Sequence, residues 1–325
     1  MHILARLLAA IGRRGTEGFA LSIFMGLALP QFATQARPLL PVTIFCFMVV
    51  VFLRADFTII LGLIRRPSVL LLACGWMVVA PALLVLGAIA VLGRDALDPG
   101  LLLGLAILGA APPIMSSPAV AILYGFEPSL IIAGVLAITI LSPLLAPPLV
   151  DFLAGQAVPL DQLVLMGRLA LFVGGGMVVA LILRRWLGRP RVAGMKAELD
   201  GFGVVMYFIF AVAAMDGVTA AALASPALVA RYLAVVFVLS FTGLIVGWLL
   251  LRFARTSDRF MLGYAAGQRN MGLLVAALGA GVPDTTFLFF ALAQFPIYLM
   301  PLLLAPVARR IRAAADPVDV RTHRP

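Results

Sequence analysis

Long apolar runs follow one another along almost the whole chain, separated by short stretches that hold most of the charged residues. An apolar run of about 20 residues is long enough to cross the hydrocarbon core of a bilayer as a helix. The stretch 55–64 is too short to cross, and we expect an extension or an interfacial turn there. The pattern predicts ten spans, at 17–34, 38–53, 67–92, 99–124, 128–150, 160–183, 201–222, 228–251, 260–281 and 284–308.

The composition agrees with that pattern. Hydrophobic residues make up 63% of the chain and charged residues only 12%, with a mean hydropathy of +1.14. Soluble domains are about 45–50% apolar and about 25% charged. We therefore expect an all-α integral membrane protein, with the lipid bilayer as a partner. The net charge of +10 does not indicate nucleic-acid binding, because the basic residues cluster between apolar runs and near the C-terminus.

The positions of Lys and Arg predict the orientation of the spans. With the N-terminus inside, Arg37, Arg94 and Arg231 lie on the outer side, Arg168 and Arg269 lie within spans, and the rest of the 24 lie on the inner side. Cytoplasmic loops carry an excess of Lys and Arg. The sequence therefore predicts a multi-pass protein of the cell (inner) membrane with both termini cytoplasmic.

The two ends of the chain differ from the spans. The N-terminal sequence MHILARLLAAIGRRG has basic residues on both sides of a short apolar run and no small-residue cleavage pattern. It favours an interfacial amphipathic helix over a signal peptide. The polar tail 313–325 is expected to be a disordered cytoplasmic segment.

Few residues offer chemistry within the membrane. Cys46 and Cys74 lie in apolar segments and indicate neither a disulfide framework nor a metal cluster, and His2 and His323 lie at the extreme termini. Sites built on histidine inside the membrane are therefore excluded, and we expect no metal and no cofactor.

Two stretches are similar to one another. Residues 117–150 and 270–308 each have a polar break, a short apolar half-helix, a tight turn and a further span, ending in the related phrases SPLLAPP and MPLLLAP. They begin in spans four and nine, and an offset of five spans inverts the second unit relative to the first. The sequence predicts two inverted five-helix repeats, residues 1–155 and 156–312.

The fourth span is interrupted by the sequence AAPPIMSSPAV. Pro112, Pro113 and Pro118 each lack an N–H and disrupt a helix, and Ser116 and Ser117 lie between them. A single proline would indicate only a kink. Three prolines beside two serines favour an unwound segment.

We expect Gly263, Gly267 and Gly272 to break the ninth span in a similar way, and they flank Gln268, Arg269 and Asn270. Arg at the centre of a membrane helix costs roughly 2.5–3.5 kcal/mol on the insertion scale. Irregular backbone at membrane depth is tolerated only where it faces protein or water. We expect Arg269 to face a wet central cavity. Paired interrupted helices in two halves indicate the binding site of a transporter, and half-helix N-termini favour anions.

With ten spans and breaks in spans four and nine, the chain resembles the bile acid:sodium symporter family. The resemblance implies a core of spans three to five and eight to ten, in which spans four and nine cross, and a panel of spans one, two, six and seven. It also implies an organic anion bound beside the crossing, between core and panel. The auxin-efflux carriers are similar in plan and need no sodium.

The ion-site motifs of that family match poorly. Its first crossing typically reads Pro-Gly-Gly-Thr-x-Ser-Asn; residues 112–118 here read PPIMSSP, which keeps Ser117 and puts Pro118 at the asparagine position. Its second crossing typically reads Glu-x-Gly-x-Gln-Asn-Ser-Gly-Leu. Here Ala265 stands at the carboxylate position and Arg269 at the glutamine position.

Other sodium ligands implied by the resemblance are also missing. The hydroxyls of span five fall near Ile131 and Val135, and the glutamine of span three falls near Trp76. Two positive charges close together in a poorly solvated site repel strongly. We therefore expect sodium to be disfavoured as a coupling ion, with Arg269 in its place as a fixed counter-ion for an anionic substrate.

Four further polar residues have a structural and a functional interpretation. Asp216 is expected near the outer surface in a solvated or capping role, with a salt bridge to Arg269 or proton coupling as the alternative. Arg168 is expected to extend outward to the interface. Gln294 and Tyr298 share one helix face, and either form a packing hydrogen bond or line the cavity.

The sequence thus favours a secondary transporter of a small organic anion that works by alternating access. The alternatives are a true sodium-coupled symporter and, in another class, a channel or a non-transporting sensor. No nucleophile with a nearby base supports an enzyme. The expected substrate-binding residues are Arg269, Gln268, Asn270, Ser116, Ser117 and Gln294, and the expected crossover backbone residues are Pro112, Pro113, Pro118, Gly267 and Gly272.

Overall fold

The computed structural model of the chain describes residues 25–55, 67–155 and 160–315. The expected N-terminal interfacial helix, residues 17–24 of the first span, the short stretch after residue 55 and the polar tail from residue 316 lie outside the described residues. Residues 313–315, expected to belong to a disordered tail, instead end α17. The described residues are helical apart from connecting turns, with one isolated β-bridge.

Among the described residues, seven helices or helix pairs are long and apolar enough to cross a membrane. They comprise α3 (Pro30–Ala36) with α4 (Leu40–Arg54), α6 (Pro67–Leu92), α9 (Ser129–Ala154), α10 (Gln162–Leu187), α12 (Lys196–Ala214) with α13 (Val218–Ala224), α14 (Pro226–Leu250) and α17 (Asp284–Ala315).

Shorter helices complete the described chain. They are α7 (Pro99–Ala110), α8 (Ser117–Leu123), α11 (Arg189–Gly194), α15 (Thr256–Gly267) and α16 (Met271–Leu278), with 3-10 turns at Arg37–Leu39, Arg94–Ala96 and Gly279–Gly281.

Acidic side chains fix two of the helix starts. The carboxylate of Asp98 accepts a hydrogen bond from the Leu101 amide at 3.0 Å, and that of Asp161 accepts one from the Val164 amide at 3.0 Å. Such caps satisfy amides that have no partner within the helix. The helices α7 and α10 therefore begin close to where the sequence places the fourth and sixth spans.

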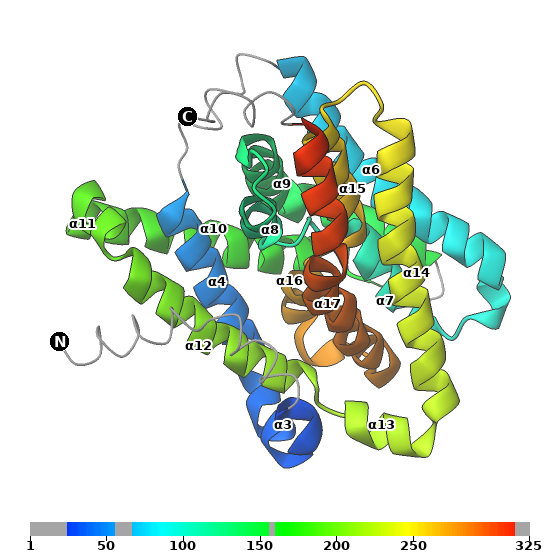
Figure 1. Cartoon of the computed structure of the whole chain (residues 1–325). Helices are drawn as coiled ribbons and strands as arrows, with labels where there is room; N and C mark the ends of the chain where they lie inside the picture. Colours follow the sequence, from blue (N-terminus) through cyan, green and yellow to red (C-terminus); the bar gives the residue numbers. More distant parts are fainter. Residues whose placement is uncertain (1–24, 56–66, 156–159, 316–325) are drawn as a thin grey trace.

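The helices lie in two groups (Figure 1). On the left of the view, α4 packs against α10 and α12, and α12 also packs against α3. In the centre and on the right, α6, α7, α9, α14, α15 and α17 pack against one another, and α9 also packs against α10 of the left-hand group. The short α16 lies between the groups and contacts α4 and α10 on one side and α7 and α17 on the other.

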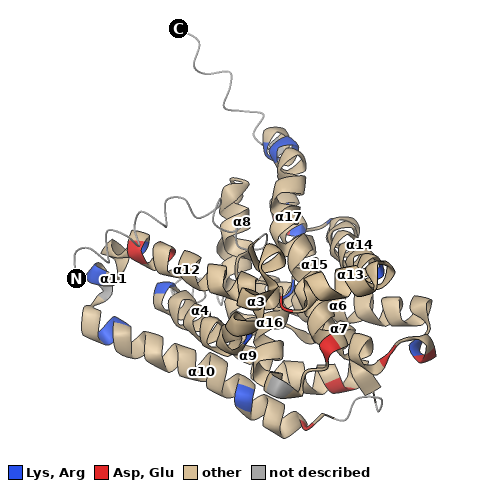
Figure 2. Cartoon of the chain, turned by 90° about the horizontal axis from the view of Figure 1, so that it is seen from below, with Lys and Arg blue, Asp and Glu red and all other residues tan. Residues whose placement is uncertain are grey.

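Charged residues are sparse along the helices and gather mostly near helix ends and turns (Figure 2). The helix surfaces carry exposed large apolar side chains in their place, among them Leu71, Leu171, Leu250 and Phe253. This distribution is the one expected for helices whose outer faces contact lipid.

Glycines bring α14 and α15 into backbone contact. A Cβ on Gly247 would lie 2.3 Å from the Cα of Gly263, and a Cβ on Gly243 would lie 2.8 Å from the amide nitrogen of Gly267. Small residues allow this close approach between membrane helices. The prediction that Gly263 and Gly267 break the ninth span is wrong, because α15 continues as a helix through Gly267.

Gly272 has a packing role too. It is the second residue of α16, and a Cβ there would lie 3.0 Å from Ile44 of α4 and 3.1 Å from Phe210 of α12. The glycine lets the start of α16 approach the left-hand group of helices.

Candidate functional site

Two helices are interrupted where the sequence predicts breaks. After α7 the chain leaves the helix at Ala111, whose ψ is 147°, and α8 begins at Ser117. The residue before a proline is pushed toward extended backbone, so Pro112 accounts for this exit. Pro118 has a different role, because it lies in the first turn of α8, where a proline starts a helix rather than breaking it.

The second interruption is shorter. Between α15 and α16, Gln268 is extended, with φ −105° and ψ 106°, and Met271 begins the next helix. Only Gln268, Arg269 and Asn270 lie outside helix, so the three polar residues of the sequence are themselves the break.

The two interruptions meet. Pro113 and Arg269 form an antiparallel β-bridge, the Ile114 amide donates to the Gln268 carbonyl at 2.9 Å, and the Asn270 amide donates to the Pro112 carbonyl at 2.8 Å. Buried backbone groups that leave a helix need other partners, and here each break supplies them to the other. The predicted crossing of the two unwound segments is therefore present.

Arg269 is buried at this crossing, with 3% of its surface exposed. Its Nη1 donates to the Ala265 carbonyl at 3.0 Å, its Nη2 donates to the Ala111 carbonyl, and its Nε has no hydrogen-bond partner. Within the described part of the chain, no Asp or Glu forms an ion pair with Arg269. The guanidinium is thus held by backbone carbonyls at the ends of α15 and α7.

Gln268 is equally buried, with 1% exposed, and neither atom of its amide group has a hydrogen-bond partner. A buried polar group without a partner costs roughly 1–3 kcal/mol. Two adjacent side chains with unsatisfied atoms at the same crossing are typical of a binding site rather than of a packed interior.

A pocket lies beside these two side chains. Its walls are Gln268 and Arg269 at the crossing, Leu108 of α7, Val236 and Ser240 of α14, and Ala293, Pro296 and Ile297 of α17. Its volume is about 10 Å³, which is room for roughly one water molecule. The expectation of a wet central cavity around Arg269 is wrong for this conformation, since helices close around the guanidinium.

The other predicted binding residues lie near the crossing but do not line this pocket. Ser117 is fully buried at the start of α8 and its Oγ has no partner, whereas Ser116 is partly exposed. Asn270 is buried directly before α16. Gln294 donates from Nε2 to the Phe290 carbonyl of its own helix at 3.0 Å, which is the structural interpretation of that residue.

Positions that the resemblance assigns to sodium ligands carry apolar contacts instead. Ile131 and Val135 are buried in a hydrophobic cluster. The Trp76 indole donates from Nε1 to the Leu262 carbonyl at 3.1 Å, which joins α6 to α15.

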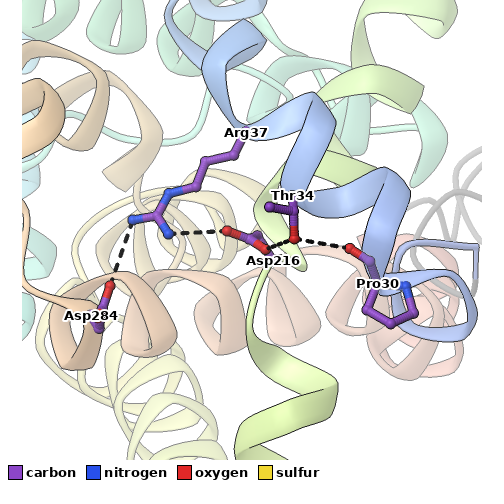
Figure 3. A network of polar contacts seen from close by, with 5 residues as sticks. All are labelled: Pro30, Thr34, Arg37, Asp216 and Asp284. Atoms are coloured by element: carbon purple, nitrogen blue, oxygen red, sulfur yellow. Dashed lines mark hydrogen bonds and ion pairs between the residues drawn. The ribbon is translucent and has the colours of Figure 1, made fainter.

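Asp216 is less solvated than expected. Its carboxylate is 11% exposed, pairs with Nη1 of Arg37 at 3.0 Å and accepts a hydrogen bond from Thr34 Oγ1 at 2.7 Å (Figure 3). Thr34 Oγ1 also lies 3.2 Å from the Pro30 carbonyl. Asp216 therefore joins the turn between α12 and α13 to the α3–α4 region, and the alternative of a salt bridge to Arg269 is not observed.

Arg37 also reaches α17. Its Nη2 lies 3.8 Å from the carboxylate of Asp284, which is 97% exposed (Figure 3). Its guanidinium stacks 4.1 Å from the ring centroid of Phe287. Arg37 thus contacts both groups of helices.

Arg168 does not simply extend outward. Its Nη1 donates to the carbonyls of Ala277 at 3.2 Å and Leu278 at 3.0 Å. These are the last residues of α16, where backbone carbonyls lack helical partners and favour a cation. The side chain is nevertheless exposed.

Several residues of the site could not be named from the sequence. Ala111 and Ala265 act through their carbonyls, which any residue type would supply. Val236 and Ser240 come from α14, where Ser240 and Thr242 are isolated hydroxyls in an apolar run, a signal too common to indicate a site.

The sequence was compared with protein-family models and with curated proteins. No family model matches it, and no curated protein matches it either.

Proposed function

We propose that the protein is a secondary transporter of a small organic anion that works by alternating access, with Arg269 as the fixed counter-ion of its substrate. The observation that carries the proposal is a buried arginine without an acidic partner at the crossing of two interrupted helices. Interrupted helices that meet within a bundle are the usual binding site of such carriers.

The order of helices supports two inverted repeats within ten spans. In the first half, the broken pair α7–α8 lies between the long helices α6 and α9; in the second half, the broken pair α15–α16 lies between α14 and α17. On this proposal, the two broken pairs are the fourth and ninth spans, and the seven long apolar elements with the first span make up the rest.

The charge distribution supports the proposed orientation. Helices α14 and α17 end at the top of Figure 1 and α4 runs upward to its end on the left, whereas α3 and α13 lie at the bottom. Arg54 ends α4, Arg252 and Arg255 follow α14, and Arg309 and Arg310 lie near the end of α17. An excess of basic residues at one end favours that end as cytoplasmic, so both termini would lie inside.

The two groups of helices supply the moving parts. We assign α6–α9 and α14–α17 to a core and α3, α4, α10 and α12 to a panel. The panel contacts the core where α10 packs against α9, at α16 and, through Arg37, at α17. An organic anion needs far more room than a pocket of about 10 Å³, so substrate entry requires the helices around Arg269 to separate.

Arg269 is better suited to replace sodium than to accompany it. Its guanidinium donates hydrogen bonds to the backbone carbonyls of Ala111 and Ala265. Carbonyl oxygens are also the ligands that a hard cation would use. A second cation at the same carbonyls would meet strong repulsion in a poorly solvated site. We therefore propose transport without sodium.

A ligand screen tests the proposal. Purified protein is heated with a series of organic anions, once with sodium and once with choline as the cation, and the melting temperature is recorded. A ligand that binds the folded state raises that temperature by mass action. We expect at least one anion to stabilise the wild type equally in both salts.

Variants locate the ligand. The stabilisation should be lost in Arg269→Gln and retained in Arg168→Gln. The second variant is a matched control, because both arginines donate hydrogen bonds to two backbone carbonyls but only Arg269 is buried. Stabilisation that requires sodium would instead favour a sodium-coupled symporter, and stabilisation that persists in Arg269→Gln would remove Arg269 from the site.

A further inference from the structure

We propose that the pocket beside Arg269 binds a single halide ion, chloride under physiological conditions, held between the guanidinium and the amide group of Gln268. This site lies within the core, because its walls come from α7, α14, α17 and the crossing. No residue of α3, α4, α10 or α12 is among those walls.

The first argument is charge. Arg269 is 3% exposed, and in the described part of the chain no carboxylate pairs with it. The carbonyls of Ala111 and Ala265 offer only partial negative charge. A buried charge without a compensating partner is costly in a low-dielectric interior, so a bound anion would stabilise this arrangement.

The second argument is the set of donors. Nε of Arg269 and the side-chain NH₂ of Gln268 have no hydrogen-bond partner, and both side chains line the pocket. Neither the nitrogen nor the oxygen of the Gln268 side-chain amide has a hydrogen-bond partner. Its NH₂ group can therefore turn toward the ligand without breaking another hydrogen bond. An anion accepts from both donors, and a cation would be repelled by the first.

The third argument is size. A pocket of about 10 Å³ holds roughly one water-sized particle. Chloride and bromide are single atoms, somewhat larger than a water molecule, and they accept hydrogen bonds without a strong directional preference. A carboxylate or a phosphate carries several more heavy atoms and cannot enter this pocket unless the helices separate.

The apolar walls also favour a halide. Leu108, Val236, Ala293 and Ile297 line most of the remaining sides, together with Ser240. A water molecule there could bond to the same donors but would leave the charge of Arg269 unchanged, whereas a halide neutralises the charge and tolerates apolar neighbours.

The inference does not require that the protein transports anything, because halide binding is measured on the purified protein. If Arg269 also binds an organic anion, the two anions are alternative ligands of one guanidinium. Chloride would then lower the apparent affinity for the organic anion.

Thermal unfolding of the full-length protein tests halide binding. Choline chloride or choline bromide replaces choline gluconate stepwise at constant ionic strength and pH. We expect a saturable rise in melting temperature of a few degrees for both halides in the wild type. The rise should be absent in Arg269→Gln, reduced in Gln268→Leu and retained in Arg168→Gln.

Anomalous scattering from a bromide-soaked crystal locates the ion directly and does not depend on the variants folding. We expect one bromide peak within hydrogen-bond distance of Arg269 Nε and the Gln268 amide. A halide-independent melting temperature together with only water in the pocket would overturn the inference. An organic-anion effect that survives in that case would leave the transport proposal standing.

Discussion

Arg168 and Arg269 are the two arginines that the sequence places within spans, and both donate hydrogen bonds to backbone carbonyls at the end of a helix segment. Their surroundings differ. Arg168 is exposed and meets the end of α16 from outside, whereas Arg269 is enclosed at the crossing and pairs with no acidic residue of the described chain. A buried charge that serves only structure is usually paired, so the unpaired charge of Arg269 indicates function.

Asp216 and Asp284 allow a prediction at the same scale, because both face Arg37 but only Asp216 is buried. Asp216→Asn keeps an acceptor for Thr34 and removes the ion pair, so we expect a loss of about 1–2 kcal/mol in the free energy of unfolding. Asp284→Asn should cause no measurable loss, because exposed pairs contribute little. Thermal or denaturant unfolding in detergent compares the two, and equal losses would contradict the role assigned to burial here.

At the scale of elements, the two breaks could be predicted and their details could not. Prolines before Ser116 and three consecutive polar residues in an apolar span leave clear signals in the sequence. Glycine does not give a clear signal of a break, because glycine occurs both where a helix is interrupted and where two intact helices pack closely. For this reason Gly263 and Gly267 were expected to interrupt α15 and instead pack against α14.

The contact between α14 and α15 yields the next prediction. A Cβ at Gly247 would lie 2.3 Å from the backbone of Gly263, and one at Gly174 of α10 would meet nothing within 4 Å. Gly247→Ala should therefore destabilise the protein by about 1–3 kcal/mol through overpacking. Gly174→Ala should be neutral or slightly stabilising. Melting temperatures of the two variants in one detergent measure the difference, and a neutral Gly247→Ala would mean that the two helices are farther apart.

At the scale of the whole molecule, the sequence predicted the helical class because apolar runs of span length leave few alternatives. The pairing of Asp216 with Arg37 was not predictable, since the two residues lie 179 positions apart and nothing local links them. The closed pocket was not predictable either, because its size depends on how α14 and α17 pack against the crossing.

The proposed orientation can be tested by labelling. In a background with Cys46→Ser and Cys74→Ser, we expect a membrane-impermeant maleimide to label Asp95→Cys in intact cells and to label Arg310→Cys only after the membrane is opened. Both positions are exposed, so access to the side chain does not bias the comparison. Labelling of Arg310→Cys in intact cells would reverse the orientation.

Counterflow in proteoliposomes tests the central claim most directly. Vesicles are loaded with an unlabelled organic anion from the ligand screen, and uptake of the labelled anion is followed with sodium or choline as the only cation. We predict a transient, saturable accumulation that is equal in both salts, abolished in Arg269→Gln and retained in Arg168→Gln. A flux that does not saturate would indicate a channel, and the absence of any flux for a ligand that binds would contradict the account of a carrier.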